Sequence, residues 1–511
     1  MQTRISKIYT ADIEGIFPRI IEVEVDINIG LSSFTLVGLA DKAVSESKER
    51  VSSALKNTGI KPPTRENRKV TVNLAPADIK KGGSQFDVAI ALGYLLASNQ
   101  IKNFDTGKKI FVGELALDGN VRPVAGALNI CSVAKSKGFD EIFIPQSNAA
   151  EVMNISDIDI YPVNSLRQLI DHLEGREEIA ALYPEEFVPQ KGVGQIDISE
   201  IKGQEAAKRT LSIAAAGGHN IFMSGPPGAG KTMLAQAIIS ILPDMTFQEA
   251  LETTQIYSAS GLLFGKPFFS SRPFRAPHHS ASLVSVVGGG QNPKPGEISL
   301  AHRGVLFLDE LPEFHRDVLE SLRQPLESGN VCIARSKGSV TFPSKFMLVA
   351  ASNPCPCGYY QDEEKECRCS AYEIIRYQKK LSGPLMDRID IHIWVNRLKS
   401  EDFRKPIDAN ESREIKKQIT LAREIQKERF EKLGVKIFSN SELSSKQIEE
   451  TVRLTPKARE FLEKALDKAY VSARGYFKIL KVAQTIADME QKDTVDEAAL
   501  SEAFSYRTRI A

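Results

Sequence analysis

The chain has 511 residues, which is too long for one hydrophobic core and predicts roughly three domains. Lysine and arginine total 66 against 65 aspartate and glutamate, so the charge balance excludes a uniformly basic coat for nucleic acid. The N-terminus lacks the apolar run of a signal peptide, and nowhere do about 18 apolar residues run together. We therefore expect a cytoplasmic protein without a membrane partner, in which any polyanion binding is local.

Residues 1–182 alternate between strand and helix patterns and predict an α+β domain. Apolar and acidic residues alternate over 21–27, as in a half-buried strand, and an apolar stripe at helical spacing covers 41–55. Further strands are expected at 70–74, 110–112 and 141–145, and helices at 86–97 and 128–137. Residues 183–194 are rich in proline, glycine and charge without a period, which is typical of a linker.

Two segments of this first domain, residues 75–84 and 113–124, resemble the Lon-type protease domain. In that family a serine nucleophile is paired with a lysine base that takes its proton. Ser84 falls where the nucleophile would be, but Leu128 stands where we would match the lysine, and leucine cannot take a proton. We therefore expect an inherited Lon-like scaffold that is not proteolytic, because a fold does not transfer its chemistry.

A glycine-rich loop with the Walker A pattern follows a predicted strand at 220–224 and precedes a predicted helix at 233–238. Its backbone N–H groups are expected to surround phosphate oxygens, while Lys231 reaches the outer phosphates and Thr232 offers its hydroxyl to Mg²⁺. We predict that this loop binds ATP through Gly225, Pro226, Pro227, Gly228, Ala229, Gly230, Lys231 and Thr232.

The Walker B pattern consists of an apolar strand over 305–308 followed by Asp309 and Glu310. A strand that is apolar on both faces belongs in the middle of a parallel sheet, so its carboxyl end should open beside the phosphate loop. We expect Asp309 to hold Mg²⁺ together with Thr232, and Glu310 to position the attacking water.

Three more polar residues resemble functional positions of AAA+ ATPases. Asn353 ends an apolar strand over 346–352, like the sensor 1 residue that orients water near the γ-phosphate. Arg388 lies in a segment that resembles the one carrying the arginine finger. The resemblance implies a ring in which Arg388 contacts the nucleotide of the neighbouring subunit. The alternative role for Arg388 is a salt bridge to Asp387 or Asp390. Arg474 precedes a predicted helix that resembles the sensor 2 helix, which implies contact with the γ-phosphate.

Seventy-eight positions separate Lys231 from Asp309, more than one helix, one strand and their loops require. The surplus, which includes 257–261, 272–282 and 287–290, resembles an insertion of the magnesium chelatase and MCM branch of AAA+ proteins, where such loops point into a central pore. The resemblance implies that residues of these loops contact a polyanion. For the histidines, the alternative is local packing or pairing. The candidates in the insertion are Arg272, Arg275, His278 and His279, and Lys337, in the loop after 331–335, is a further candidate.

Four of the six cysteines form two Cys-x-Cys pairs, Cys355 with Cys357 and Cys367 with Cys369. Four thiolates in one loop satisfy tetrahedral Zn²⁺ and would fill its coordination, so we predict a structural zinc site. Free or redox-active thiols are the alternative.

From residue 396 the chain becomes strongly charged, with an amphipathic helix predicted over 411–430 and three or four further helices. We expect the lysines and arginines of the first helix to form a solvated face rather than to contact DNA.

Together these features resemble the YifB/ComM-type magnesium chelatase-like AAA+ ATPases with an N-terminal Lon protease-like domain. The fold class implied is α/β: a P-loop AAA+ module with a parallel sheet, preceded by an α+β Lon-like domain and followed by a helical lid. The predicted domains are a Lon-like domain at 1–182, a linker at 183–194, an AAA+ core at 195–395 and a lid at 396–511.

The resemblance to ComM implies a hexameric, ATP- and Mg²⁺-dependent DNA helicase that drives branch migration during natural transformation, with single-stranded or branched DNA as its partner. Two alternatives lack DNA activity: an ATPase that powers metal insertion into a porphyrin-like ring, and a nucleotide-switched scaffold that remodels a protein. The Lon-like domain argues against the first, because chelatase motor subunits are expected to lack it.

Overall fold

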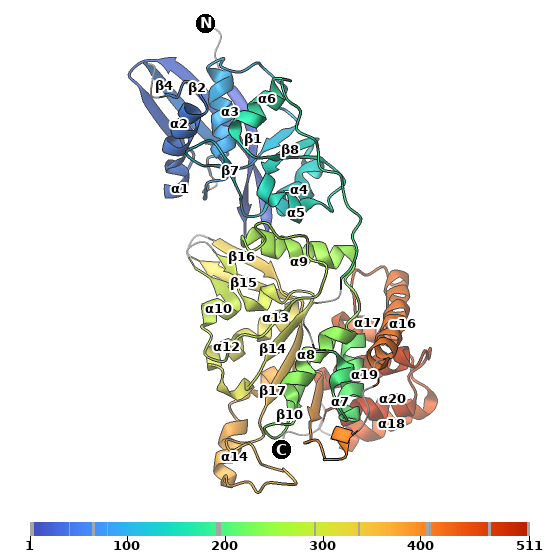
Figure 1. The fold of residues 1–511 in the computed structure, drawn as a ribbon. Helices are drawn as coiled ribbons and strands as arrows, with labels where there is room; N and C mark the ends of the chain where they lie inside the picture. The colour runs from blue at the N-terminus through green and yellow to red at the C-terminus, as the bar shows by residue number, and fades with distance from the viewer. Residues whose placement is uncertain are drawn as a thin grey trace. The chain divides into compact units, whose positions relative to one another are not determined.

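A computed structural model describes residues 5–39, 41–63, 67–78, 80–190, 196–290, 293–335, 338–404, 408, 410–468 and 472–507, with only the backbone at 335, 338, 403, 467 and 468. The chain forms two compact units (Figure 1). Unit 1 comprises Met1–Val188 and Phe247–Ser270, and unit 2 comprises Pro189–Thr246 and Ser271–Ala511.

Unit 1 is built on a seven-stranded mixed sheet in the order β3-β4-β2-β1-β5-β8-β9. The pairs β1/β2 and β2/β4 are antiparallel, and the other neighbours are parallel. In β2 the residues Ile21, Val23 and Val25 are fully buried, as the alternation in the sequence predicts. The strands are β1 (Ser6–Glu14), β2 (Phe17–Ile29), β3 (Ser33–Val37), β4 (Arg68–Ala75), β5 (Lys109–Phe111), β8 (Glu141–Pro145) and β9 (Asp159–Val163).

The helix α3 is buried along its whole length and packs on β1 and β2, because all of its residues except Asp87 are apolar or small. The sequence predicts one helix over 41–55, whereas the structure has two helices that meet at Glu46. A short hairpin, β6 (Glu114–Leu115) with β7 (Val121–Arg122), completes this part. The helices are α1 (Lys42–Ser45), α2 (Ser47–Asn57), α3 (Asp87–Ala97), α4 (Ala127–Ala134), α5 (Ala149–Val152) and α6 (Leu166–Leu173).

Helix α9 (Phe247–Ala259) belongs to unit 1, although it lies between the Walker A and Walker B motifs in the sequence. It packs on α4: the side chain of Gln255 donates to Ser132 (3.0 Å), and the carbonyl of Ser258 accepts from the N–H of Gly126 (2.8 Å). From the sequence, we expect 257–261 and 272–282 to belong to the same insertion. The structure separates them, because the apolar face of α9 is covered within the N-terminal unit.

Unit 2 contains a five-stranded parallel sheet in the order β11-β14-β17-β10-β18. Ile221 and Met223 of β10 pack in one core with α7 (Glu205–Gly217) and α8 (Lys231–Ile241), while Phe222 faces a second core on the other side. The carboxyl ends of β10, β14 and β17 are therefore neighbours at one edge of the sheet. The strands are β10 (Ile221–Ser224), β11 (Phe274–Arg275), β14 (Val305–Leu308), β17 (Met347–Ser352) and β18 (Ile391–Trp394).

Short elements cover the face of this sheet to which Phe222 belongs. Two of them are antiparallel hairpins, β12/β13 and β15/β16. Lys337, predicted to contact a polyanion, lies outside the described residues. The elements are α10 (Leu283–Val287), β12 (Gly288–Gly289), β13 (Lys294–Pro295), α11 (Glu297–Leu300), α12 (Arg316–Ser321), α13 (Arg323–Ser328), β15 (Asn330–Arg335), β16 (Gly338–Pro343), α14 (Ala371–Gln378) and α15 (Gly383–Met386).

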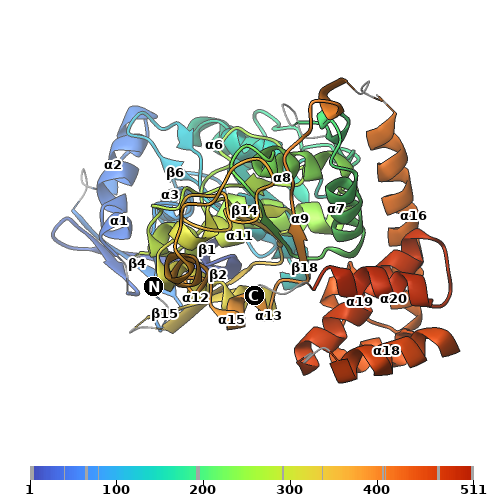
Figure 2. The same cartoon turned by 90° about the horizontal axis from the view of Figure 1, so that it is seen from below.

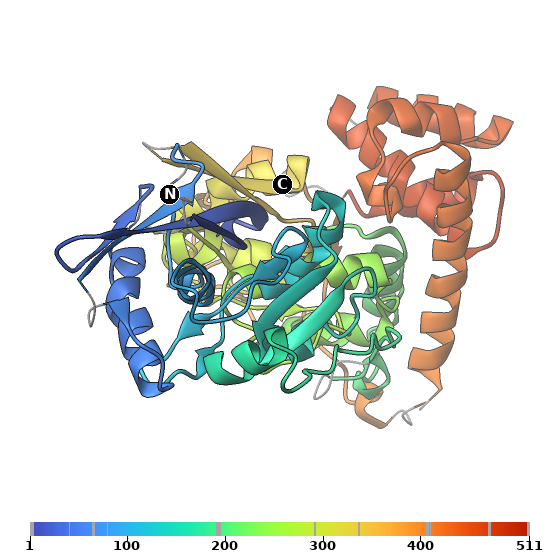
Figure 3. The same ribbon diagram turned by 90° about the horizontal axis from the view of Figure 1, so that it is seen from above.

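The C-terminal helices belong to the same compact unit as the parallel sheet, since α16 and α19 pack on α7. Figure 2 labels the long helix α16 and the later helices α18, α19 and α20, and Figure 3 shows this region from the opposite side in orange and red. None of the helices within the described ranges combines the length and apolarity needed to cross a membrane. The helices are α16 (Glu411–Lys432), α17 (Ser445–Thr451), α18 (Pro456–Lys468), α19 (Ala473–Met489) and α20 (Glu497–Ser505).

Candidate nucleotide site

The phosphate loop connects β10 to α8, at the edge of the sheet where parallel strands end. Gly228 and Gly230 have φ values of 78° and 88°, a left-handed conformation that glycine adopts without steric cost. At Gly225 a Cβ would lie 2.2 Å from the carbonyl oxygen of Val395, so only glycine fits there. The loop leads into the N-terminus of α8, whose free N–H groups and partial positive charge attract an anion.

Lys231, the first residue of α8, is only 8% exposed. Its amine donates to the carbonyl oxygens of Gly225 (2.7 Å) and Pro226 (2.9 Å), and to the side-chain oxygen of Asn353 (3.1 Å). Burial lowers the pKa of Lys231 to about 8, although the nearby carboxylates of Asp309 and Glu310 oppose the shift. The structure thus brings the predicted phosphate-binding lysine and the predicted sensor asparagine into direct contact.

Thr232 and Asp309, the two predicted Mg²⁺ ligands, also meet. The hydroxyl of Thr232 donates to Oδ2 of Asp309 at 2.7 Å, which joins the start of α8 to the end of β14. A hydroxyl and a carboxylate are hard oxygen ligands of the kind that Mg²⁺ prefers. The residues therefore fit a magnesium ion that is also bound by nucleotide phosphates.

Glu310 directly follows Asp309 and has φ 51° and ψ 47°, a left-handed conformation that strains a residue with a side chain. Its own N–H donates to Oδ1 of Asp309 (2.9 Å), and its side chain is 54% exposed. Backbone strain of this kind occurs at functional sites, where the surrounding fold maintains it. The turn places the partly exposed carboxylate of Glu310 beyond the end of β14, outside the sheet.

The histidines of the loop after β11 lie close to Glu310. Nδ1 of His279 is 3.3 Å from Oε2 of Glu310, and the rings of His278 and His279 have centroids 4.0 Å apart. The rings of His279 and Phe314 also form a T-shaped pair, with centroids 6.5 Å apart. The sequence leaves two alternatives for these histidines: contact with a polyanion, or local packing and pairing. His279 pairs locally, with Glu310.

The arginines of the same region make local contacts. Arg272 donates to the carbonyl oxygens of Pro243 and Arg303, both at 2.7 Å. Arg275 forms a bidentate ion pair with Glu297, at 2.5 and 2.7 Å. Both guanidinium groups are thus held by groups of their own unit, which makes them weaker candidates for polyanion contact than the sequence suggests.

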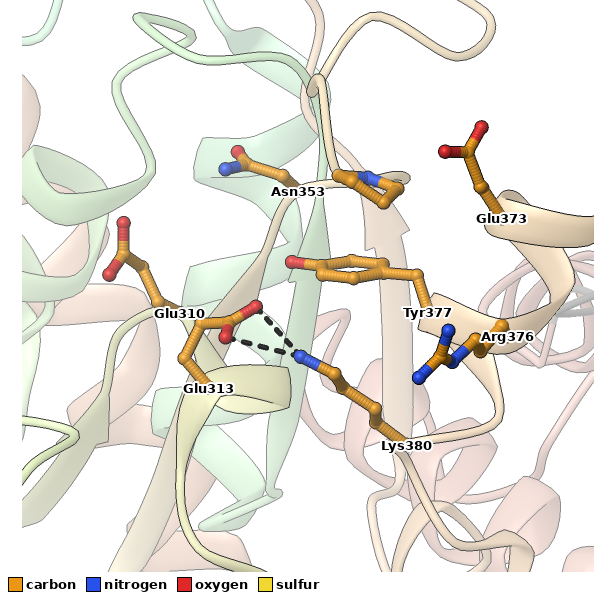
Figure 4. Close-up of a pocket in the computed structure, with 8 residues that line it drawn as sticks. Glu310, Glu313, Asn353, Glu373, Arg376, Tyr377 and Lys380 are labelled. Carbon is orange, nitrogen blue, oxygen red and sulfur yellow. Dashed lines mark hydrogen bonds and ion pairs between the residues drawn. The ribbon is translucent and has the colours of Figure 1, made fainter. Parts of the chain in front are cut away.

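A pocket of about 580 Å³ adjoins Glu310 and Asn353. Figure 4 shows the hydroxyl end of Tyr377 pointing toward the side that Glu310 and Asn353 form, and burial raises the pKa of Tyr377 to about 12. Two positive side chains line the pocket, Arg376 on α14 and Lys380 just after it. The amine of Lys380 pairs with the carboxylate of Glu313 at 3.2 Å. Two of its lining residues, Glu310 and Asn353, belong to motifs that the sequence shows, but the others come from turns and a helix that no motif marks, so the sequence does not identify the pocket. The lining residues are Glu310, Glu313, Asn353, Pro356, Glu373, Arg376, Tyr377 and Lys380.

Arg388 and Arg474 lie together at a shared carboxylate. Nη2 of Arg388 is 2.7 Å from Glu327, and Nη2 of Arg474 bonds to the same oxygen, Oε1. The carboxylate that Arg388 pairs with is thus Glu327, whereas the sequence proposes Asp387 or Asp390. Within the described part of the chain, neither arginine forms a hydrogen bond or ion pair with Lys231 or with Asp309.

Comparisons with known proteins agree with this arrangement. The family described as "Magnesium chelatase, subunit ChlI" matches residues 197–403, and two related families, "Subunit ChlI of Mg-chelatase" and "Magnesium chelatase, subunit ChlI C-terminal", match 23–148 and 409–507. Competence protein ComM of Haemophilus influenzae is 43% identical, over 98% of this chain and 97% of the relative. The protein YifB of Escherichia coli K12 is 41% identical, over 98% and 97%.

The chain belongs to the magnesium chelatase-like ATPases of the ComM and YifB type. It is an AAA+ ATPase, and its family uses ATP with Mg²⁺. A Lon protease of Brevibacillus choshinensis is 25% identical over 30% of this chain and 20% of that protein. The predictions of family and of fold class are thereby confirmed. The predicted domain boundaries and the roles of individual residues stay predictions.

In this ATPase the four clustered cysteines converge just beyond Asn353. Their sulfur atoms all lie within 4.8 Å of one another, with Cys355, Cys357 and Cys367 at 3.4 to 3.7 Å. Sulfurs bound to tetrahedral Zn²⁺ at about 2.3 Å are about 3.8 Å apart, so the donor set fits this ion. Burial opposes ionisation of Cys357, but hydrogen bonds from the backbone of Tyr359 and Arg368 lower its pKa to about 6, whereas the pKa values of Cys367 and Cys369 are raised beside the other sulfurs.

The Lon-like part of the ATPase holds Ser84 against a carboxylate. Among the residues that the structure describes, the hydroxyl of Ser84 bonds to Glu114 and to no lysine. Leu128, at the position matched to the catalytic lysine, is completely buried in α4. A carboxylate can accept the proton of Ser84, but the serine–lysine pair of the Lon family is not formed.

Proposed function

We propose that this ATPase is a ring-forming motor that acts on branched DNA, as a helicase or branch-migration factor. The observation that carries the proposal is the division of the predicted site into two parts. Lys231, Thr232, Asp309 and Asn353 form one connected group, whereas Arg388 and Arg474 converge elsewhere, at Glu327. A neighbouring subunit that supplies the arginines would complete the site, which favours a closed ring over a monomer. We take the hexamer as its size from the resemblance to ComM.

Each residue of the connected group has a role in phosphoryl transfer. Thr232 and Asp309 would hold Mg²⁺, which would supply positive charge to offset the charge of the transition state. Lys231 exchanges its bonds with two backbone carbonyls for bonds with the phosphates, and Asn353, already beside this amine, contacts the γ-phosphate. Glu310 orients the attacking water from its strained turn.

The ring is tested by mixing Arg388→Ala subunits with Lys231→Ala subunits, each inactive alone. If Arg388 acts across the subunit boundary, mixed rings contain sites with an intact Lys231 and an intact Arg388, and part of the ATPase activity returns. Mixtures that recover no activity at any ratio would remove the main support for action in trans.

DNA as the partner is supported by the loop after β11. His279 connects this loop to Glu310, so a polyanion that displaces the loop would change the position of the water-activating carboxylate. ATP turnover is measured with and without forked DNA, with Lys231→Ala as the blank. Stimulation and unwinding are expected, and the absence of both would refute DNA as the partner.

The second candidate function is a nucleotide-switched remodeller of a protein partner, or a chelatase-type ATPase, without DNA activity. It is favoured by the pairing of Arg275 with Glu297 and by the bonds of Arg272 to backbone carbonyls, which leave both arginines less available to phosphates. The balanced charge of the chain points the same way. ATP turnover that forked DNA does not change would favour this candidate.

We propose further that Cys355, Cys357, Cys367 and Cys369 hold a structural Zn²⁺ ion, which would supply a cross-link for a loop with few apolar residues. Their sulfur spacing is the supporting observation. Elemental analysis of protein purified under reducing conditions should find one zinc per chain, and a protein without zinc would refute the site.

A further inference from the structure

Glu327 stands between two positive groups that come from different elements. It lies in the last turn of α13, Arg388 follows α15, and Arg474 lies in the first turn of α19. Both guanidinium groups bond to the same oxygen of this carboxylate, Arg388 at 2.7 Å. Hydrogen bonding from Arg388, and to a lesser degree the charge of Arg474, lowers the pKa of Glu327 and keeps it ionised.

The two arginines are held differently. Arg388 is 11% exposed and also donates to the carbonyl oxygen of Pro384 at 2.5 Å, so its position is set by the core. Arg474 is 53% exposed, and its contact with Glu327 determines where its guanidinium group lies. Two guanidinium groups repel each other unless an anion lies between them, and planar guanidinium groups bind carboxylate and phosphate oxygens by the same hydrogen bonds.

We propose that Glu327 is a built-in competitor of nucleotide phosphate: its carboxylate occupies the anion position between Arg388 and Arg474 and must give way before the two arginines bind a phosphate group. This inference rests on the roles proposed above for Arg388 and Arg474. Because one carboxylate pairs with both, its departure makes both guanidinium groups available at the same time, and the two arginines then act on one phosphate group.

The lid helix has a second anchor that allows this exchange. Lys478, one turn after Arg474 on α19, pairs with the buried Asp390 at 2.8 Å. Release of Arg474 from Glu327 therefore leaves α19 attached to the core. For the same reason, loss of the Glu327 charge should affect nucleotide affinity more than folding.

The test is Glu327→Gln, which keeps the size of the side chain and removes its charge. The KM for ATP should fall roughly threefold to tenfold, because the glutamine competes less well for the arginines. Inorganic phosphate, the simplest phosphate ligand, should inhibit ATP hydrolysis at a correspondingly lower concentration. The matched control is Glu320→Gln, since Glu320 pairs with a different arginine, Arg323 on the adjoining helix, at 2.6 Å, and its KM should equal that of the wild type.

Combining Glu327→Gln with Arg474→Ala should abolish the gain in affinity, because the arginine that Glu327 would release is gone. An unchanged KM and unchanged phosphate inhibition in Glu327→Gln would overturn the proposal. So would a raised KM with a lowered kcat, which would make Glu327 only a support for the arginines. Thermal unfolding near the wild-type temperature establishes that the variant is folded. If Arg388→Ala and Arg474→Ala both keep full ATPase activity, the failure lies instead with their proposed roles.

Discussion

The amine of Lys231 lies 3.1 Å from the side-chain oxygen of Asn353, across 122 positions of sequence. The contact exists because β17, which ends just before Asn353, pairs in parallel with β10, which leads into the phosphate loop. A parallel sheet places the carboxyl ends of its strands at one edge, so residues from distant segments meet there.

Replacing Lys231 by alanine should reduce kcat for ATP hydrolysis by about a hundredfold or more, because the γ-phosphate loses its nearest positive charge in the transition state. Steady-state phosphate release measures the loss. Lys379→Ala, which removes an exposed lysine at the end of α14, should retain wild-type turnover. Comparable losses in both variants would argue against a specific role for Lys231.

The pKa of Lys231, lowered to about 8, makes ATP binding depend on pH. Below this pKa the amine is charged and attracts phosphate; above it the amine is neutral and the attraction is lost. We expect kcat/KM for ATP to fall as the pH rises through about 8, toward about tenfold per pH unit. Arginine stays charged in this range, so Lys231→Arg should lack this decline, whatever its absolute rate. A wild-type profile that is flat from pH 7 to 9.5 would contradict the prediction.

His279→Ala should raise the DNA-independent kcat by about two- to fivefold and leave the KM for ATP unchanged. The reason is that Nδ1 of His279 holds the carboxylate of Glu310 at 3.3 Å, and its loss frees that carboxylate to orient water. His278→Ala is the control, because His278 bonds to Ser280 instead, at 2.8 Å. A change in KM with constant kcat would place His279 in nucleotide binding and not in the positioning of Glu310.

Asp390→Asn should lower the free energy of unfolding by about 3 kcal/mol, because it leaves Lys478 buried without its counter-charge. Burial opposes ionisation of Asp390, but Lys478 and His219 hold its pKa below the usual range. Because the pKa of Asp390 is lower in the folded state than in the unfolded state, its ionised form stabilises the fold at pH values above the unfolded-state pKa, near 4. This stabilisation is lost as the pH falls below about 4 toward the folded-state pKa. Urea unfolding at pH 7 measures the difference, with the exposed Asp493→Asn as control; equal stability of the two variants would refute it.

Cys357→Ser should lose the bound zinc predicted for the cysteine loop, since three sulfur ligands and a hydroxyl bind the ion far less well. Elemental analysis of the reduced protein gives the stoichiometry. Cys332→Ser, which changes an exposed cysteine outside the cluster, should keep one zinc per chain. Retention of zinc by Cys357→Ser would contradict a site in which all four cysteines bind the ion.

The sequence by itself determined the family, the fold class and the local motifs. The phosphate loop from Gly225 to Thr232 and the pair Asp309 and Glu310 are contiguous, because backbone turns and strand ends impose their residue types locally. Amphipathic strands and helices can be predicted for the same reason: β2 includes the strand predicted at 21–27, and α16 includes the helix predicted at 411–430.

Only the tertiary structure decided which distant residues share a partner. Glu327 meets Arg388 and Arg474, and α9 joins the N-terminal unit, through contacts between segments that lie far apart in the sequence. Such contacts depend on how elements pack and leave no periodicity or spacing by which to find them. A charged residue on a helix is most often solvated, so nothing in the sequence distinguishes Glu327 from other surface carboxylates, and only the fold brings two arginines to it.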